Sequence, residues 1–339
     1  MNTLSVLTLA RGRASHLANM MLGLSRQSVQ PDEFIVIVMQ DTPYENLPEV
    51  DFPVRQILAP AGVMNLSAAR NLAASEAIGE ALVFLDIDCI PAPHCLRDYR
   101  DALETCDGLL MGEVMYLPAG ANDEGWTYAA FEAVSERHSD RRGPPAYGVE
   151  ACPDYRCFWS LNFAIRGTRF ASSGGFDEEF TGYGGEDTDF AKGFTLAGNA
   201  LAWVNGARVY HQHHTHHMPP VHHLETVVRN AEIFESKWGY RTMGHWLHAF
   251  RLMGLIDDTP GQPIRILRAP NADDLALTGQ QAHQPYANTA SVISILEQRQ
   301  ATREAALAAL RPTEAAVPLP VPPGSLSPDA VNPVAIAAE

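Results

Sequence analysis

Two short acidic clusters hold the side chains in this chain that are best suited to chemistry. Asp86 and Asp88 directly follow the apolar run 81–85, which we interpret as a buried strand. Two carboxylates delivered at the end of a strand are typical ligands of a divalent cation. The second cluster, Glu186 and Asp187, follows paired glycines, whose lack of a side chain lets a ligand approach the backbone closely. One site for a metal and one for a base indicate group transfer from a phosphorylated donor.

Both acidic pairs also have a purely structural interpretation. The first pair could cap the helix expected from about Pro93, and the second could open a helix over 187–197, where acids favour the first turn. Two carboxylates at the exit of a buried strand favour a metal site over a cap. A helix start is compatible with catalysis, because it holds a carboxylate in place.

Composition narrows the classes of partner. The chain has 339 residues, 46% of them hydrophobic, which suits one large domain or two smaller ones. A net charge of -16 and a pI near 5.2 argue against nucleic acid and anionic membranes as partners, because both attract basic surfaces. An acidic protein that holds a nucleotide diphosphate needs a cation to offset the repulsion.

Cysteine usage and the N-terminus predict a cytoplasmic protein. The five cysteines show no paired zinc spacing, and their odd number fits a reducing compartment. The expected strand 4–9 has no basic region before it and no convincing cleavage site after it. No uninterrupted apolar stretch approaches the roughly 20 residues that a membrane span needs.

The first 90 residues alternate strand and helix patterns. Strands are expected at 4–9, 34–39, 54–58 and 81–85, with helices at 15–26 and 66–78, the second capped by Asn65. This alternation predicts a mostly parallel sheet with helices on both faces, and such sheets bind ligands at the carboxyl ends of their strands. Three polar segments lie at such ends and are expected to converge on one crevice: Thr8 to Arg13, Gln40 with Asp41, and Asp86 to Asp88.

Later elements are less regular. The pattern predicts helices at 93–106, 126–138, 224–238 and 292–310, a strand at 109–116, and a returning apolar strand within 196–209. That strand leads into a histidine-rich run, 211–217, followed by His222 and His223. Beyond Arg311 the chain is rich in proline and alanine, and we expect this tail to be disordered.

Four stretches, taken in their order and spacing, resemble a known family: Leu66 to Asn71, Phe84 to Asp88, Gly174 to Phe180, and Gly184 to Asp187. They resemble the inverting glycosyltransferases of the GT-A fold, of the family 2 type, with a galactosyltransferase-type C-terminal region. The resemblance covers roughly residues 3–240. It implies an α/β, Rossmann-like mixed and mostly parallel sheet flanked by helices, with a C-terminal helical extension.

The same resemblance suggests a division of the chain. Residues 1–240 would form the GT-A domain, with a nucleotide-binding half at 1–90 and an acceptor and catalytic half at 91–240. Residues 241–311 would be the helical extension, and 312–339 the disordered tail.

The resemblance also implies roles for individual residues. Asp88 matches the metal-binding aspartate of the Asp-x-Asp motif, and Asp86 the one that contacts the nucleotide sugar. Asp187 matches the catalytic base, and Glu186 its neighbour that contacts acceptor or donor hydroxyls. His211, just after the returning strand, matches the metal-binding histidine.

Four further positions match nucleotide-binding ones. Ala10 and Arg13 fall on the nucleotide loop, Asp41 on the base-recognition position, and Arg70 near the ribose or diphosphate. Arg70 could instead be a surface charge on an Ala-rich helix. The family often has a double aspartate where this chain has Gln40 and Asp41, which weakens the expected base contact.

The sugar and acceptor side is expected to include aromatic, glycine and histidine residues. We assign Trp159, Tyr183, Gly184, Gly185 and His214 to it, although Trp159 fits a core position equally well. The galactosyltransferase branch has Trp where this chain has Tyr183, so acceptor preference does not transfer. The histidine run could also be a solvated loop or an unspecific metal tract, with His213 or His214 replacing His211 as the ligand.

These features predict a metal-dependent glycosyltransferase of the hexosyltransferase class. It would move a sugar from a nucleotide diphosphate donor, foremost a UDP-sugar, to a hydroxyl-bearing glycan or small molecule, with Mn²⁺ or Mg²⁺ as cofactor. One alternative is a nucleotidyltransferase, but the loop Arg11 to Arg13 is too short for its basic Gly-rich loop. Another is a His-rich metal-binding protein, which has no use for the Gly-Gly-Glu-Asp loop.

Overall fold

The computed structural model describes residues 3–60, 62, 64–279 and 284–309. Residues up to Glu297 belong to one compact unit, and those from Gln298 onward to a second. The tail predicted to be disordered, 312–339, lies outside the described residues. Within the described part of the chain, no helix is both long and apolar enough to cross a membrane.

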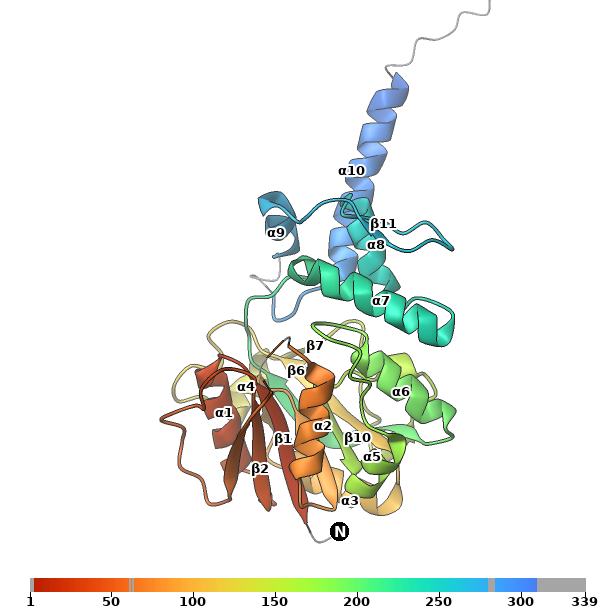
Figure 1. Ribbon diagram of the computed structural model, residues 1–339. Coiled ribbons are helices and arrows are strands. Elements are labelled where there is room, and N and C mark those ends of the chain that lie inside the picture. Colours follow the sequence, from red (N-terminus) through yellow and green to blue (C-terminus); the bar gives the residue numbers. More distant parts are fainter. Residues whose placement is uncertain (1–2, 61, 63, 280–283, 310–339) are drawn as a thin grey trace, which may run out of the picture. The chain divides into compact units, whose positions relative to one another are not determined.

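A mixed sheet forms the centre of the first unit (Figure 1). Its strand order is β3-β2-β1-β4-β9-β6-β10-β5, with β7 beside β6 and β8 beside β10. The strands β1 to β4 are parallel to one another, β9 is antiparallel to both of its neighbours, and β6 is parallel to β10. The strand bounds are β1 (Leu4–Ala10), β2 (Glu33–Val38), β3 (Val54–Leu58), β4 (Ala81–Leu85), β5 (Cys89–Pro91), β6 (Leu109–Tyr116), β7 (Glu136–Arg137), β8 (Val149–Ala151), β9 (Asn162–Arg166) and β10 (Leu201–His211).

Helices cover both faces of this sheet. The bounds of all described α-helices are α1 (Ala14–Ser25), α2 (Leu66–Glu76), α3 (Cys95–Thr105), α4 (Tyr128–Val134), α5 (Gly167–Ser173), α6 (Glu186–Leu196), α7 (Leu224–Trp238), α8 (Gly244–Leu252), α9 (Ala272–Thr278) and α10 (Thr289–Ala309). A second, two-stranded sheet pairs β11 (Ile256–Asp257) with β12 (Arg265–Ile266).

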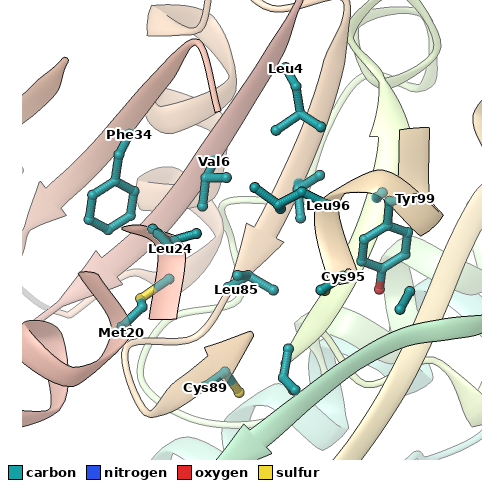
Figure 2. Close-up of a cluster of buried hydrophobic side chains, with 14 of the residues drawn as sticks. Leu4, Val6, Met20, Leu24, Phe34, Leu85, Cys89, Cys95, Leu96 and Tyr99 are labelled. Carbon is teal, nitrogen blue, oxygen red and sulfur yellow. The ribbon is translucent and has the colours of Figure 1, made fainter. Parts of the chain in front are cut away.

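The two faces of the sheet carry separate cores, because side chains alternate along each strand. Val6 packs on one face with α1 and α3, through residues such as Met20 and Leu96, as Figure 2 shows. Its neighbour Leu7 packs on the other face with Ala73 of α2 and with phenylalanines of α5 and α6. Burial on both faces explains why β1, β2 and β4 are almost continuously apolar.

Most elements expected in the first half are confirmed, including α2 with its cap, in which Asn65 Oδ1 accepts a hydrogen bond from Ala68 N at 2.8 Å. Other expectations need correction. The helix predicted at 126–138 is only α4, because β7 begins at Glu136. His211 is the last residue of β10 rather than the residue after it. The sequence patterns missed β9, α8 and α9.

The residues after α7 have a small core of their own. Val227 and Ala231 of α7 pack with Leu247 and Phe250 of α8 and with Ile264. This cluster lies within the first compact unit. The boundary expected at residue 240 stays a prediction.

A buried amide ties β9 to β6 and to β10, the strand beyond it. Asn162 Nδ2 donates hydrogen bonds to the carbonyl oxygens of Glu113 at 3.1 Å and Ala207 at 2.9 Å, and its Oδ1 accepts one from Tyr99 Oη at 2.8 Å. Gly112 lies against this amide. A Cβ there would overlap the Ala207 carbonyl oxygen, the Asn162 amide and the Tyr99 hydroxyl.

We therefore expect Gly112→Ala to lower the free energy of unfolding by about 3 kcal/mol or more, as overpacked core sites do. The matched control is Gly193→Ala in α6, where a Cβ meets nothing within 4 Å. That change should raise the free energy of unfolding by about 0.5–1 kcal/mol, because alanine favours the helix over glycine. Urea unfolding of both variants measures the contrast, and equal stability of the two would contradict it.

Candidate active site

Asp88 lies at the centre of a group formed by three distant segments. It follows β4, and the pairing of His211 with Cys89 between β10 and β5 brings His211 beside it. His211 Nε2 is 3.4 Å from Asp88 Oδ1, and His214 Nε2 is 3.2 Å from Oδ2. Arg13 Nη1 donates a hydrogen bond to Oδ2 at 2.7 Å. The polar ends of β1, β4 and β10 therefore meet, as expected for the ligand crevice of such a sheet.

The donor set around Asp88 fits a divalent transition metal. One ligand atom each from Asp88, His211 and His214 lie within 4.8 Å of one another. His211 Nδ1 is buried and has no hydrogen-bond partner among the described residues. One carboxylate with two imidazoles suits Mn²⁺, Fe²⁺ or Zn²⁺ better than the all-oxygen shells that Mg²⁺ prefers. The structure thus groups His214, assigned above to the sugar side, with the two predicted ligands.

The charges of this group also suit a cation. Burial lowers the pKa of His211 to about 4, so its imidazole is neutral at pH 7, the form that binds metals. Although burial opposes ionisation of Asp88, His211, His214 and Arg13 together hold the pKa of this carboxyl well below its ordinary value. Because His211 is neutral at pH 7, the permanent charge that keeps Asp88 ionised is the Arg13 guanidinium.

The second acidic motif sits at the start of α6. Gly185 precedes the helix with φ of 94°, and Gly184 has φ of 89°. A Cβ on Gly184 would lie 2.7 Å from Met243 Sδ and 2.9 Å from the Trp246 ring, so only glycine fits there. Asn230 of α7 holds this loop by donating a hydrogen bond to the Gly184 carbonyl oxygen at 2.8 Å.

Arg70 joins the two acidic motifs. This α2 side chain is 4% exposed, and its Nη1 lies 3.2 Å from Glu186 Oε1 while its Nη2 lies 3.9 Å from Asp86 Oδ1. Its guanidinium also lies over the Phe176 ring, 5.2 Å from the centroid. A single buried cation therefore links Asp86, two residues before Asp88, to Glu186, the neighbour of Asp187.

Burial and like charges shift two carboxyls toward neutral pH. Burial raises the pKa of Asp187 to about 7, the negative charge of Glu186 adds to the rise, and Arg70 opposes it. Burial likewise raises the pKa of Asp86 to about 7, with Arg70 again opposing and Asp88 and Glu186 adding. A carboxylate with a pKa near the working pH is suited to general base catalysis.

The remaining predicted residues lie at different distances from this centre. Tyr183 stacks between the rings of His223, at 4.9 Å, and Trp246, at 5.8 Å. Trp159 is half-buried and meets the His138 ring edge-on at 5.2 Å. Ala10 is buried at the end of β1. Asp41 is exposed after β2, and no contact given for the described residues joins it to the acidic group.

Sequence reasoning missed two residues that support the site. Asp189 is buried and accepts hydrogen bonds from Trp238 Nε1 at 2.7 Å and Lys237 Nζ at 2.8 Å, which ties α6 to α7. Tyr116, at the end of β6, stacks on the His211 ring at 4.7 Å. The position of Asp189 within the acidic motif was the only signal for the first, and the strand-end position of Tyr116 for the second.

Replacing Arg70 should destabilise the protein, because the carboxylates that Arg70 pairs would then repel one another without a compensating cation. We expect Arg70→Met to lower the free energy of unfolding by about 3 kcal/mol at pH 8, as for other broken buried pairs. The loss should be smaller at pH 5. The pKa values of Asp86 and Asp187 are raised in the folded state, and they rise further without Arg70. At low pH both carboxyls are protonated, which relieves the repulsion. The free energy of unfolding of the variant therefore falls as the pH rises through these pKa values.

Urea unfolding at the two pH values measures this dependence. The control is Arg156→Met, which removes an exposed pair with Asp154 and should cost less than about 1 kcal/mol. A loss for Arg70→Met that is the same at both pH values would contradict the electrostatic explanation.

Comparisons with known proteins cover most of the region described above. Residues 5–165 match the family model for glycosyl transferase family 2, and residues 150–217 match one described as the N-terminal domain of galactosyltransferase. Validoxylamine A glucosyltransferase from Streptomyces hygroscopicus subsp. limoneus is 25% identical over 202 residues, 49% of this chain and 42% of that protein. Chondroitin synthase from Escherichia coli is 27% identical over 241 residues, 62% of this chain and 34% of that protein. The chain thus spans half or less of the length of these relatives.

Among solved structures, that of GalNAc-T7 with UDP, GalNAc and Mn²⁺ superposes with a TM-score of 0.51 at 15% identity. It covers 83% of this chain and 55% of GalNAc-T7, and it shows a common fold. The two family segments overlap at residues 150–165 and together contain both acidic motifs, which confirms the resemblance inferred from the sequence. The chain therefore has the GT-A fold, and its residues 5–165 are similar to glycosyl transferase family 2.

Proposed function

We propose that this chain transfers a sugar from a nucleotide diphosphate donor, a UDP-sugar, to an acceptor hydroxyl with inversion at the anomeric carbon. The observation that carries the proposal is the Arg70 bridge, which joins Asp86 of the first acidic motif to Glu186 of the second. GalNAc-T7, which shares the fold, has been solved with UDP and Mn²⁺, and this agrees with a UDP-linked donor and a divalent cation.

The proposed donor end lies at the Asp88 group. A divalent cation held by Asp88, His211 and His214 would neutralise the charge that develops on the leaving diphosphate. Arg13 lies in the same group and offers its guanidinium to phosphate oxygens. Asp86, which Arg70 holds beside this group, would contact the sugar of the donor.

The proposed chemistry is a single displacement. Asp187 takes the proton of the acceptor hydroxyl while the hydroxyl oxygen of the acceptor forms a bond to the anomeric carbon. The bond from that carbon to the diphosphate oxygen breaks at the same time. Glu186, oriented by Arg70, contacts sugar hydroxyls. Gly184 and Gly185 allow the tight turn that places Glu186 and Asp187 at the start of α6, Tyr183 packs beside this turn, and Trp159 offers a ring face to the sugar.

Metal affinity tests the donor end. We expect Asp88→Ala, His211→Ala and His214→Ala each to weaken Mn²⁺ binding, measured by calorimetry at pH 7.5, by about tenfold or more. UDP binding should weaken in parallel and also after EDTA treatment, because the acidic protein needs the cation to hold a diphosphate.

The matched control is His217→Ala in the same histidine run, whose Nδ1 lies 3.0 Å from Thr278 Oγ1. This variant should keep the affinity of the parent protein. Loss of Mn²⁺ binding in the control, with retention in the other three, would move the metal site further along the run.

Replacing the base tests the catalytic end. Asp187→Asn should reduce turnover about 10²-fold or more, while UDP affinity stays within about twofold, because the amide keeps the shape but cannot take the proton. In the parent enzyme kcat/KM should rise with pH through about 7, since the carboxyl of Asp187 must lose its proton to act.

Glu186→Gln provides an internal check on the rise of kcat/KM with pH. Removing the negative charge that raises the pKa of Asp187 should move the rise in kcat/KM to lower pH. A limb that stays at the same pH in this variant, or near-normal turnover of Asp187→Asn, would assign the base to another residue.

A further inference from the structure

Arg141 is a buried cation without a polar partner. It lies between β7 and β8, is 7% exposed, and both of its Nη atoms are buried with no hydrogen-bond partner among the described residues. The indole Nε1 of nearby Trp203 is also buried without a partner. Burying a guanidinium is costly unless its N–H groups are bonded, so this cluster of donors is suited to an acceptor from outside the chain.

Aromatic rings cover the guanidinium. It lies over the Trp159 ring at 4.9 Å from the centroid and over the Trp203 ring at 5.1 Å. An arginine held against aromatic rings keeps its fork of N–H groups, which can bind a planar oxoanion with two parallel hydrogen bonds.

Among the residues that the structure describes, no carboxylate forms an ion pair with Arg141. The groups with the largest influence on Arg141, besides its burial, are the phenols of Tyr116 and Tyr99 and the thiols of Cys89 and Cys157, which are all neutral at pH 7. The neighbouring Arg142, by contrast, is exposed and paired with Glu150.

Ring contacts connect Arg141 to the active site. Trp159, assigned above to the sugar side, meets His138 at 5.2 Å, and His138 meets Tyr116 at 5.7 Å. Tyr116 in turn stacks on His211. Tyr286 packs on His138 at 4.3 Å and closes this aromatic wall.

We propose that Arg141 binds an anionic group, a carboxylate or similar oxoanion, on the acceptor sugar, whose ring lies against Trp159. This rests on the proposed function. The diphosphate of the donor already has Arg13 and the Asp88 group, and Arg141 comes from the half of the chain outside residues 1–90. Because the net charge is -16, an acidic acceptor gains nothing from the overall field and needs a local cation.

The test compares two acceptor probes that differ in one group, p-nitrophenyl β-glucuronide and p-nitrophenyl β-glucoside. Calorimetry with UDP and Mn²⁺ present should show the glucuronide binding to the parent protein about tenfold tighter, as expected for charged hydrogen bonds. Arg141→Gln should remove this preference, and Arg141→Lys should keep part of it. The exposed Arg142→Gln is the matched control and should behave as the parent.

Equal binding of the two probes by the parent protein would overturn the proposal, and so would a preference that survives in Arg141→Gln. The parent comparison needs no variant, so it decides even if Arg141→Gln fails to fold in a thermal melt. A second experiment compares the binding of UDP-glucuronate and UDP-glucose. If Arg141→Gln weakens the binding of UDP-glucuronate alone, Arg141 binds the donor, and the proposal that it binds the acceptor is overturned. If the parent protein does not bind UDP at all, the proposed function itself is contradicted.

Discussion

A single buried guanidinium allows this site to exist. Asp86, Asp88, Glu186 and Asp187 bring four carboxyls close together in a chain that is already strongly acidic. Coulombic repulsion and desolvation both oppose that arrangement, and Arg70 pairs with one acid from each motif. Asp187 forms no ion pair with Arg70. The pKa of the Asp187 carboxyl therefore remains raised, and a raised pKa suits a base that acts near neutral pH.

The cations of the site are divided between its two ends. Arg13 pairs with Asp88, and Arg70 pairs with Asp86 and Glu186. Sheet topology explains how these residues meet: Arg13 follows β1, Asp86 and Asp88 follow the neighbouring β4, and β10 returns beside β5 to deliver His211. The antiparallel β9, fixed by Asn162, separates β4 from β6 and so connects the two halves of the sheet.

The parts of this arrangement that follow from local pattern could be predicted from the sequence. Buried strands such as β4 read as apolar runs, and the acids at its end were expected where the structure has them. β9 was missed because it begins with Asn162, a polar residue whose burial depends on backbone partners far away in sequence. α8 begins after Met243 without a capping side chain, so it carried no start signal. α9 did carry one, a capping box between Asn271 and Asp274, which could have been recognised.

The attachment of the Gly184 loop to α7 has a consequence for how this protein can be recombined. Asn230 donates a hydrogen bond to the loop carbonyl, and Trp238 and Lys237 donate hydrogen bonds to Asp189 in α6. All three donors lie beyond residue 217, where the matched family segments end. A chimera that exchanges the acidic motif between relatives must therefore include α7, because the family segment by itself leaves α6 without these anchors.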